Sequence, residues 1–418
     1  MSEFTQLPEA VSNNAVCEGF VDGIPYLYSF GGIDTSKKYT GIHLRSYRVN
    51  LLTGKSERID DLHDTLGKIA AAASRIGNII YICGGYHVFE NHSEKSSNKC
   101  HRFDILKNRF IEDGANIPVA TDDHVQVVFR DSLLYLITGW SDRTNIPNVQ
   151  IYDPKSNSWQ IGTPLTNNNV YKSFGASGVL LHDTIYFFGG ASSGPGFPIQ
   201  NRLRVGIVNA SNPTEIQWND ELIDVRTKGY RMAACSVKDQ VHWIGGSEVT
   251  YNYDGIAYNG SGIVDPAKRD LYLRIRNHNW QSAINGLLPM DLRGIAELND
   301  SVKFIAGGMI NNAEVSKSVI RLEWNNVVSI RQSQIEKQTG SSIFMRHDQL
   351  GNKIFIEAND NLLRNGRYEI FNMSGLKVVE KKAINSHRDI LIGFLAPGTY
   401  VLKVYHEKNI FPLKFIKK

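Results

Sequence analysis

The chain has 418 residues, more than one hydrophobic core usually serves, so we expect two domains or a repeat architecture. Its formal net charge of +4 is small and its lysines and arginines are spread along the chain, which argues against a nucleic-acid-binding surface. No run of about 18 apolar residues is present, so no membrane-spanning helix is expected.

An apolar run that ends in a glycine pair recurs six times within residues 1–330. The second glycines stand at positions 32, 85, 139, 190, 246 and 308, and the third copy has Thr-Gly instead of Gly-Gly. Ile, Val, Tyr, Phe and Trp dominate each run, so each predicts a β-strand. Glycine suits the end of this strand because a side chain there would collide with the neighbouring sheet, and because glycine adopts a positive φ without strain.

Further short strands flank each run. Residues 69–74 and 230–236 are small or apolar stretches upstream of a glycine pair, and residues 149–159 follow one. Asp153-Pro154 predicts a turn and Trp159 the start of a fourth strand. Such units, repeated every 51 to 62 residues, resemble the kelch repeat. The resemblance implies an all-β fold, with a six-bladed kelch-type β-propeller over residues 1–330.

The ring of such a propeller must be closed. The last repeat shows no fourth strand after residues 319–324, whereas Phe4–Leu7 near the N-terminus has the pattern of the missing strand. We expect this segment to pair with the blade that contains Gly307 and Gly308, which removes two exposed sheet edges.

The last part of the chain has another pattern. Residues 331–342 predict a linker, and residues 343–418 alternate apolar and polar residues in five or more short segments, which predicts a small β-sandwich. The Phe-Asn-Met-Ser-Gly motif at 371–375, the Leu-Ala-Pro-Gly-Thr-Tyr motif at 395–400 and the terminal lysines resemble the type A sorting domain of the bacterial type IX secretion system. An immunoglobulin-like tail is the alternative.

The resemblance to a sorting domain implies an extracellular or cell-surface protein that interacts with the secretion machinery. The first residues have neither a basic segment nor an apolar segment of a signal peptide. We interpret the N-terminus as processed, truncated or misassigned. All four cysteines are expected as buried thiols on strands; Cys83 and Cys100 are the two that could pair, and the sequence leaves that pairing open.

The ligand site is expected on loops that join the second strand of a blade to the third, and the fourth to the next blade. Their aromatic, basic and polar side chains suit a glycan or a peptide. The candidate ligand-binding residues are Lys68, Tyr86, His124, Trp140, Arg143, Tyr171, Lys172, Tyr230, Arg231, Glu248, Tyr251, Tyr253 and Arg293.

The longest insertion, residues 247–269, contains three tyrosines. We expect it to overhang a funnel, with Tyr251 and Tyr253 facing the ligand and Arg231 and Arg293 beneath them. The alternative is a loop that packs on the rim and buries its own tyrosines.

Signals for catalysis are few. The sequence contains no GxSxG or HExxH motif and no phosphate-binding loop with a lysine. His87, Glu90 and His92 lie in a Ser/Asn/Lys-rich loop, where solvation is the expected role, so neither a metal nor a cofactor is predicted. A binding module for a glycan or peptide is the predicted function. The alternative is an enzyme resembling the six-bladed kelch sugar-acid mutarotases, with Arg231, Arg293 and Glu248 as candidate active-site residues.

Overall fold

The computed structural model describes residues 1–223, 227–324, 344–348, 353–357, 366–372, 375–384, 389–396, 398–406 and 409–417. The chain divides into two compact units, Met1–Asn326 and Val327–Lys418. The predicted linker, residues 331–342, lies outside the described residues.

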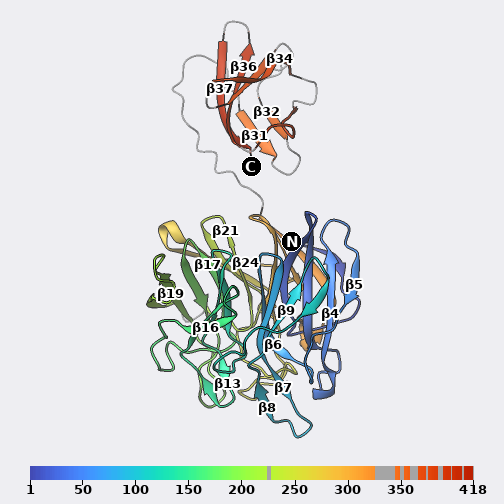
Figure 1. Cartoon of the computed structure of the whole chain (residues 1–418), viewed down its shortest axis with the longest axis vertical. Helices are drawn as coiled ribbons and strands as arrows, with labels where there is room; N and C mark the ends of the chain where they lie inside the picture. Colours follow the sequence, from blue (N-terminus) through green and yellow to red (C-terminus); the bar gives the residue numbers. More distant parts are fainter. Residues whose placement is uncertain are drawn as a thin grey trace. The chain divides into compact units, whose positions relative to one another are not determined.

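Six sheets of four or five strands make up most of the described part of the first unit (Figure 1). The first three sheets are β2 (Ala15–Val21), β3 (Ile24–Ile33), β4 (Ile42–Asn50) and β5 (Ser56–Ile59); β6 (Ile69–Ile76), β7 (Ile79–Val88), β9 (Cys100–Asp104) and β10 (Arg109–Ile111), with β8 (Glu94–Ser96) beside β7; and β11 (Val125–Phe129), β12 (Leu133–Ile137), β15 (Val149–Asp153) and β16 (Ser158–Ile161).

The other three sheets continue in chain order. They are β17 (Ser177–Leu181), β18 (Thr184–Phe188), β19 (Arg202–Val208) and β20 (Ile216–Leu222); β21 (Ala233–Val237), β22 (Gln240–Ile244), β23 (Arg269–Arg274) and β24 (Asn279–Ile284); and β26 (Ala296–Asn299), β27 (Val302–Ala306), β30 (Ser318–Glu323) and β1 (Ser2–Gln6). Short elements in the connections are β13 (Trp140–Ser141), β14 (Thr144–Asn145), β25 (Arg293–Gly294), β28 (Met309–Ile310), β29 (Glu314–Val315) and the 3₁₀ turns η1 (Tyr39–Gly41), η2 (Ile275–Asn277) and η3 (Asn311–Ala313).

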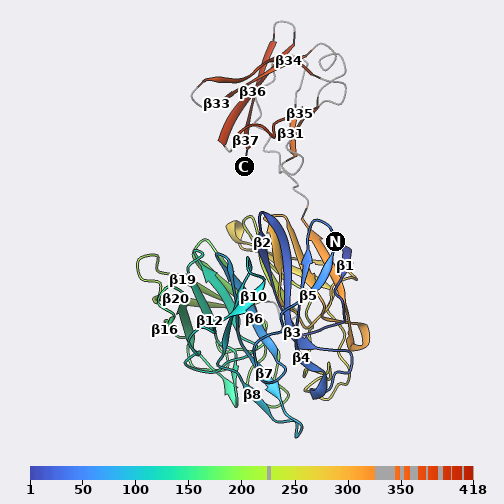
Figure 2. The same ribbon diagram turned by 45° about the vertical axis from the view of Figure 1, so that its right-hand side comes forward.

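The first strands of the sheets surround a common axis. Contacts run from β2 to β6, β6 to β11, β11 to β17 and β17 to β21; β25 then contacts β21, and β26 contacts β2. The sheets therefore form a closed ring, which is the arrangement of a β-propeller. Figure 2 shows β2, β3 and β4, which pair in this order in the first sheet. The predicted all-β propeller is confirmed.

The N-terminal strand closes the ring as expected. β1 pairs antiparallel with β30, the strand that follows the Gly307-Gly308 pair. The next residue, Leu7, is buried and donates its backbone N–H to the carbonyl oxygen of Lys317 at 2.8 Å. Phe4 packs edge-on against Phe304 with ring centroids 5.2 Å apart. The strand begins two residues earlier than the sequence pattern indicates.

The glycine pairs join neighbouring sheets. In the fourth copy, Gly189 and Gly190 have φ values of 74° and 81°. A Cβ on Gly189 would lie 2.1 Å from the carbonyl oxygen of Gly229, on the connection to the next sheet. Gly190 donates its N–H to that same oxygen at 2.8 Å. Both reasons for glycine that the sequence indicated therefore hold here.

Two local expectations about side chains also hold. Trp159 lies in β16, and its ring centroid is 5.0 Å from that of Tyr152 on β15. Cys83 and Cys100, on the paired strands β7 and β9, form the disulfide that the sequence left open. Cys17 and Cys235 are free and buried.

The second unit contains two sheets that share one hydrophobic core. One sheet is β31 (Phe344–Asp348), β32 (Lys353–Glu357) and β35 (Asp389–Leu391), and the other is β34 (Lys377–Ala383), β33 (Arg367–Asn372), β36 (Gly398–His406) and β37 (Asn409–Lys417). Ile354 and Ile390 of the first sheet pack in the same core as Ile370 and Leu402 of the second. The predicted small β-sandwich is confirmed.

Candidate functional site

A ring of hydrogen-bonded backbone surrounds the axis at, or just before, the start of the first strand of each sheet. Its six members share a positive φ, and we call them the axial ring: Asn13, Ala70, Asp123, Gly175, Arg231 and Asp291. Arg231 donates its backbone N–H to Gly175, Gly175 to Asp123 and Asp123 to Ala70, at 2.8, 2.8 and 3.1 Å. The backbone therefore brings side chains from distant repeats together on the axis.

The charged members of the axial ring form a buried ion-pair cluster. Arg231 donates from Nε and Nη2 to the two carboxylate oxygens of Asp123, at 3.1 and 2.7 Å, and its Nη1 lies 3.1 Å from Oδ1 of Asp291. The three side chains are at most 2% exposed. Burial alone would lower the pKa of Arg231, but the charge of Asp123 and then that of Asp291 hold it well above its usual value. The guanidinium therefore remains charged.

The long insertion covers this cluster. Tyr251 is fully buried, its ring centroid lies 5.5 Å from the guanidinium carbon of Arg231, and its hydroxyl donates to Asp291 at 3.4 Å. Tyr253 is 7% exposed. The insertion does lie over Arg231, but Tyr251 packs on the protein itself, as in the alternative interpretation of the sequence, whereas Tyr253 is largely buried and lines a separate hollow described below. We call this the closed end of the axis, because the Arg231 side chain is only 1% exposed there.

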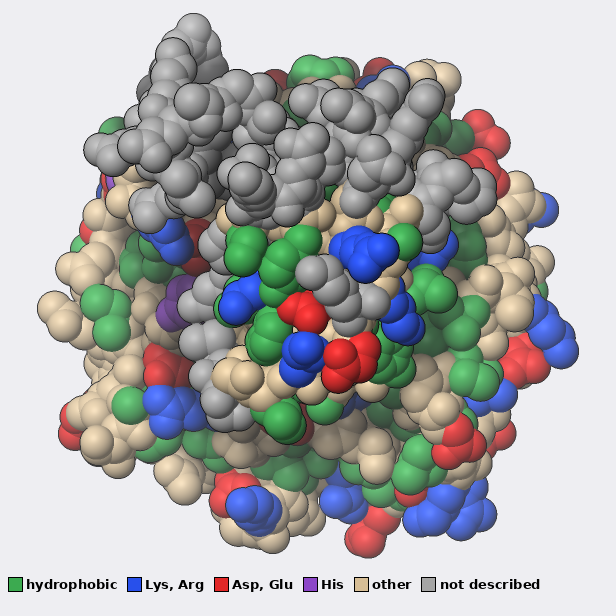
Figure 3. All heavy atoms as spheres, turned by 90° about the horizontal axis from the view of Figure 1, so that it is seen from above, with side chains coloured by type: hydrophobic (Ala, Val, Ile, Leu, Met, Phe, Trp, Pro, Cys, Tyr) green, Lys and Arg blue, Asp and Glu red, His purple; other side chains and the backbone are tan. Residues whose placement is uncertain are grey.

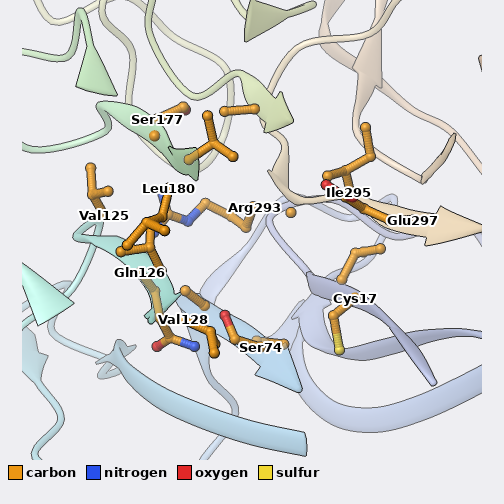
Figure 4. A pocket seen from close by; sticks show the side chains of 18 of the residues that line it. Cys17, Ser74, Val125, Gln126, Val128, Ser177, Leu180, Arg293, Ile295 and Glu297 are labelled. Carbon is orange, nitrogen blue, oxygen red and sulfur yellow. The ribbon is translucent and has the colours of Figure 1, made fainter. Parts of the chain in front are cut away.

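A cavity of about 340 Å³ occupies the axis beyond the axial ring. It is lined from all six sheets by Val16, Cys17, Glu18, Ala72, Ala73, Ser74, Arg75, His124, Val125, Gln126, Val127, Val128, Ala176, Ser177, Gly178, Val179, Leu180, Met232, Ala234, Ser236, Arg293, Gly294, Ile295 and Glu297. Side chains nearest the axial ring are buried, whereas Ser74, Val128 and Leu180, farther along their strands, are partly exposed. This axial cavity therefore opens away from the closed end. Figure 4 shows Ser74, Val125, Ser177 and Arg293 around the cavity.

Two predicted site residues lie at the base of the axial cavity. Arg293 is 6% exposed; its Nη1 lies 3.3 Å from Oδ1 of Asp123, and its Nη2 donates to the carbonyl oxygen of His124 at 2.9 Å. Arg293 Nε has no hydrogen-bond partner in the described chain. Burial, together with the charge of Arg293, lowers the pKa of His124 to about 3, so this imidazole is neutral at physiological pH.

The mouth of the axial cavity carries paired charges. Arg75 Nε donates to Glu18 Oε1 at 3.3 Å, and the Lys303 ammonium lies 2.5 Å from Glu297 Oε2. Burial raises the pKa of Glu297. The sequence-based search missed all four of these residues.

A second hollow lies among the loops that follow the second strands. We call it the rim depression, and its lining is Lys37, Lys38, Tyr39, His92, Glu94, Asn252, Tyr253 and Asp254. The Tyr39 and His92 rings meet edge to face, with centroids 6.0 Å apart. The Lys37 ammonium donates to the carbonyl oxygen of Ala313 at 3.0 Å. Aromatic, cationic and anionic groups from three sheets thus converge on one hollow.

The remaining predicted residues do not meet in one place. Lys68 is buried, and its ammonium lies 2.5 Å from Asp64 Oδ2 and 2.9 Å from His101 Nε2. Tyr86 and Tyr230 are buried, Trp140 packs on Phe174, and Glu248 pairs with Arg269 at 2.7 Å. Arg143 is exposed, and Tyr171 and Lys172 are half-buried. The structure therefore separates the residues of the predicted funnel into the closed end, the axial cavity and isolated positions.

The axial ring has a sequence signal that could have been found. Each member precedes the second glycine of its repeat by 15 to 19 positions. Aligning the repeats on their glycine pairs would have placed Asn13, Asp123, Arg231 and Asp291 within a window of five positions. Of these, only Arg231 is among the candidate ligand-binding residues of the sequence analysis.

His87, Glu90 and His92 show no metal-binding arrangement. Among the residues that the structure describes, no three His, Cys, Asp or Glu side chains are grouped so as to hold a metal ion. On the face shown in Figure 3, basic and acidic side chains alternate among the coloured atoms, without a large patch of one charge. The described part of the chain also contains no helix long and apolar enough to span a bilayer.

Comparisons with known proteins agree with the ring of sheets. Residues 124–166 match the Kelch motif family model. The first unit is a β-propeller, and its third sheet lies within this match. The chain is similar to the solved structure of YjhT with a TM-score of 0.60 and 13% identity, over 77% of this chain and 97% of that one, which supports the shared fold alone.

Curated relatives resemble only part of the chain. Kelch-like protein 36 of Mus musculus is 23% identical over 175 residues, which are 41% of this chain and 26% of that protein. Kelch-like protein 26 of Mus musculus is 25% identical over 127 residues, 30% of this chain and 20% of that protein. The chain therefore spans about a quarter of the length of these relatives.

Proposed function

We propose that the β-propeller is a binding module that holds a peptide or a glycan in the rim depression. The observation that carries this proposal is the convergence of Tyr39, His92 and Tyr253 on one hollow, each from a loop that follows the second strand of a different sheet. Aromatic faces bind peptide planes and sugar rings, while the nearby lysines and acids orient a polar ligand.

Alanine substitution of two aromatic side chains that line the rim depression tests this proposal. Purified protein is screened on peptide and glycan arrays, and hits are measured again with Tyr39→Ala and His92→Ala. Each variant is expected to weaken binding by about 1–3 kcal/mol, as for aromatic hot spots. Leu222→Ala is the control, because Leu222 is 60% exposed on the outer strand β20 and does not line the depression. Unchanged binding of the hits by both aromatic variants would contradict the proposal.

The sugar-acid mutarotase alternative gains no support from its candidate residues. Arg231 is enclosed with Asp123 and Asp291, Arg293 lines the axial cavity, and Glu248 is surface-exposed beside Arg269. A general acid or base must reach the same substrate as the groups that bind it, and these three residues do not line a common pocket.

We further propose that the second unit directs export to the cell surface or medium through the type IX pathway. The proposal rests on the motifs at 371–375 and 395–400; Met373 and Ser374 of the first motif and Pro397 of the second lie outside the described residues. Deleting residues 327–418 in a host competent for type IX secretion is expected to leave the protein in the periplasm. Normal export of the deleted form would contradict the assignment.

A further inference from the structure

The base of the axial cavity holds a cationic group with an unused donor. Arg293 is 6% exposed, and its Nε–H has no partner in the described chain, although Nη1 and Nη2 both have one. Leaving a buried donor of a charged group unsatisfied is costly, and such groups in native proteins are almost always paired. An acceptor is therefore expected at this position when the site is occupied.

Protein carboxylates at the axis are already engaged. Asp123 accepts two hydrogen bonds from Arg231, so its contact with Arg293 at 3.3 Å is the longest of its three. Asp291 accepts from Ser12, Asn13 and Arg231. Neither acid can turn toward Arg293 Nε without giving up contacts with Arg231.

Other polar groups of the cavity do not replace the missing acceptor. His124 is neutral, and the Gln126 amide donates to the carbonyl oxygen of Tyr81 at 3.3 Å. Glu18 and Glu297, the two acids in the lining, are paired with Arg75 and Lys303. Arg293 therefore shares Asp123 with Arg231, and its Nε–H has no acceptor among the described residues.

The shape of the cavity leaves room for a small molecule. Its walls include Ala72, Gly178, Ala234 and Ser236, whose side chains are short, and its volume is about 340 Å³. Figure 4 shows side chains from several sheets around the same space, with Arg293 among them. Guanidinium and carboxylate groups match in charge and geometry.

We propose that the axial cavity binds a small molecule through a carboxylate that accepts a hydrogen bond from Arg293 Nε. This site is separate from the rim depression, because no residue lines both. Binding there can therefore be lost or retained independently of the proposed peptide or glycan site.

Nuclear magnetic resonance of ¹⁵N-arginine-labelled full-length protein tests the proposal. The Arg293 Nε–H signal is assigned by its loss in Arg293→Lys, and the protein is then titrated with acetate, propionate and benzoate, with benzamide as the uncharged match for benzoate. At least one carboxylate is expected to shift this signal in a saturable manner, while benzamide leaves it unchanged. If none of the three carboxylates shifts it, or if benzamide acts like benzoate, the proposal is wrong.

Two variants test whether a carboxylate that shifts the Arg293 Nε–H signal binds in the axial cavity. Arg293→Lys keeps the positive charge but removes Nε, and it is expected to weaken that carboxylate roughly tenfold or more. Ala234→Phe fills the cavity from β21 without touching the Arg293 contacts and is expected to abolish binding, with its thermal unfolding showing that it folds. Arg274→Lys is the control, because Arg274 is exposed and does not line the cavity. Undiminished binding by Ala234→Phe would overturn the assignment to the cavity.

Discussion

The guanidinium of Arg231 makes two hydrogen bonds to the carboxylate of Asp123, a residue 108 positions earlier in the chain, and both side chains are inaccessible to water. This contact links the third and fifth sheets across the axis, and Asp291 extends it to the sixth. The pair therefore holds the sheets together at one end of the axis, whereas the sequence analysis assigned Arg231 to ligand binding.

Removing one partner of this pair is expected to be costly. Arg231→Met leaves Asp123 buried without its main counter-charge and should destabilise the first unit by about 3–5 kcal/mol. Unfolding is followed by tryptophan fluorescence, since all six tryptophans lie in residues 1–326. Arg130→Met is the matched control: Arg130 pairs with Asp183 at the surface, where the loss of an ion pair has little effect on stability. Equal effects of both variants would contradict the structural role.

Tyr251 is expected to act as a core residue. Tyr251→Ala should destabilise the first unit by about 3–5 kcal/mol, because it empties a buried aromatic position beside Tyr230 and Arg231. Ile263→Ala in the same insertion, where the side chain is 61% exposed, should change stability by about 0.5 kcal/mol or less. A Tyr251→Ala variant with the wild-type denaturation midpoint would restore the ligand-facing interpretation of this tyrosine.

Strand β1 is expected to stabilise the whole ring. Deleting residues 2–9 removes the pairing with β30 and the buried Leu7, and exposes a sheet edge. We expect a loss of about 3–5 kcal/mol in the free energy of unfolding, in the upper range of single-site effects. Phe4→Ala keeps the backbone pairing of β1 and should therefore lower the free energy of unfolding by less than the deletion does. An unchanged melting temperature of the deletion variant would show that the ring does not depend on this strand.

His124 predicts a loss of stability in mild acid. Its folded pKa of about 3 lies below the ordinary value of 6.5, so the unfolded chain binds the proton more readily. Neutral His124 therefore contributes fully to the free energy of unfolding above about pH 6.5. This contribution is lost as the pH falls from there toward 3, and the loss reaches about 2 kcal/mol at pH 5.

The histidine variant separates this effect from general acid denaturation. Between pH 7 and pH 5, His124→Gln should lose about 2 kcal/mol less stability than the wild type. His182→Gln serves as the control because the His182 side chain is 74% exposed. If both variants keep the wild-type pH dependence, burial of neutral His124 does not govern it.

Local patterns alone predicted most of the fold. Strands of β-branched and aromatic residues, turns such as Asp153-Pro154 and the glycine pairs depend on interactions within a few residues or with the adjacent sheet. The same is true of the tail, where alternating apolar and polar residues predicted short strands and the structure has such strands, β32 (Lys353–Glu357) among them. These features repeat, so each copy supports the interpretation of the others.

The candidate sites depended on the tertiary structure. Asn13, Asp123, Arg231 and Asp291 meet only because the ring brings positions from distant repeats to one axis. The position of the insertion decides which end of that axis is open. A tyrosine such as Tyr251 looks the same in the sequence whether its side chain faces a ligand or is buried, as it is here. Sequence spacing determined that the strands form repeating sheets, whereas ring closure decided which charged groups pair across the axis and that Arg293, which shares Asp123 with Arg231, also lines a cavity.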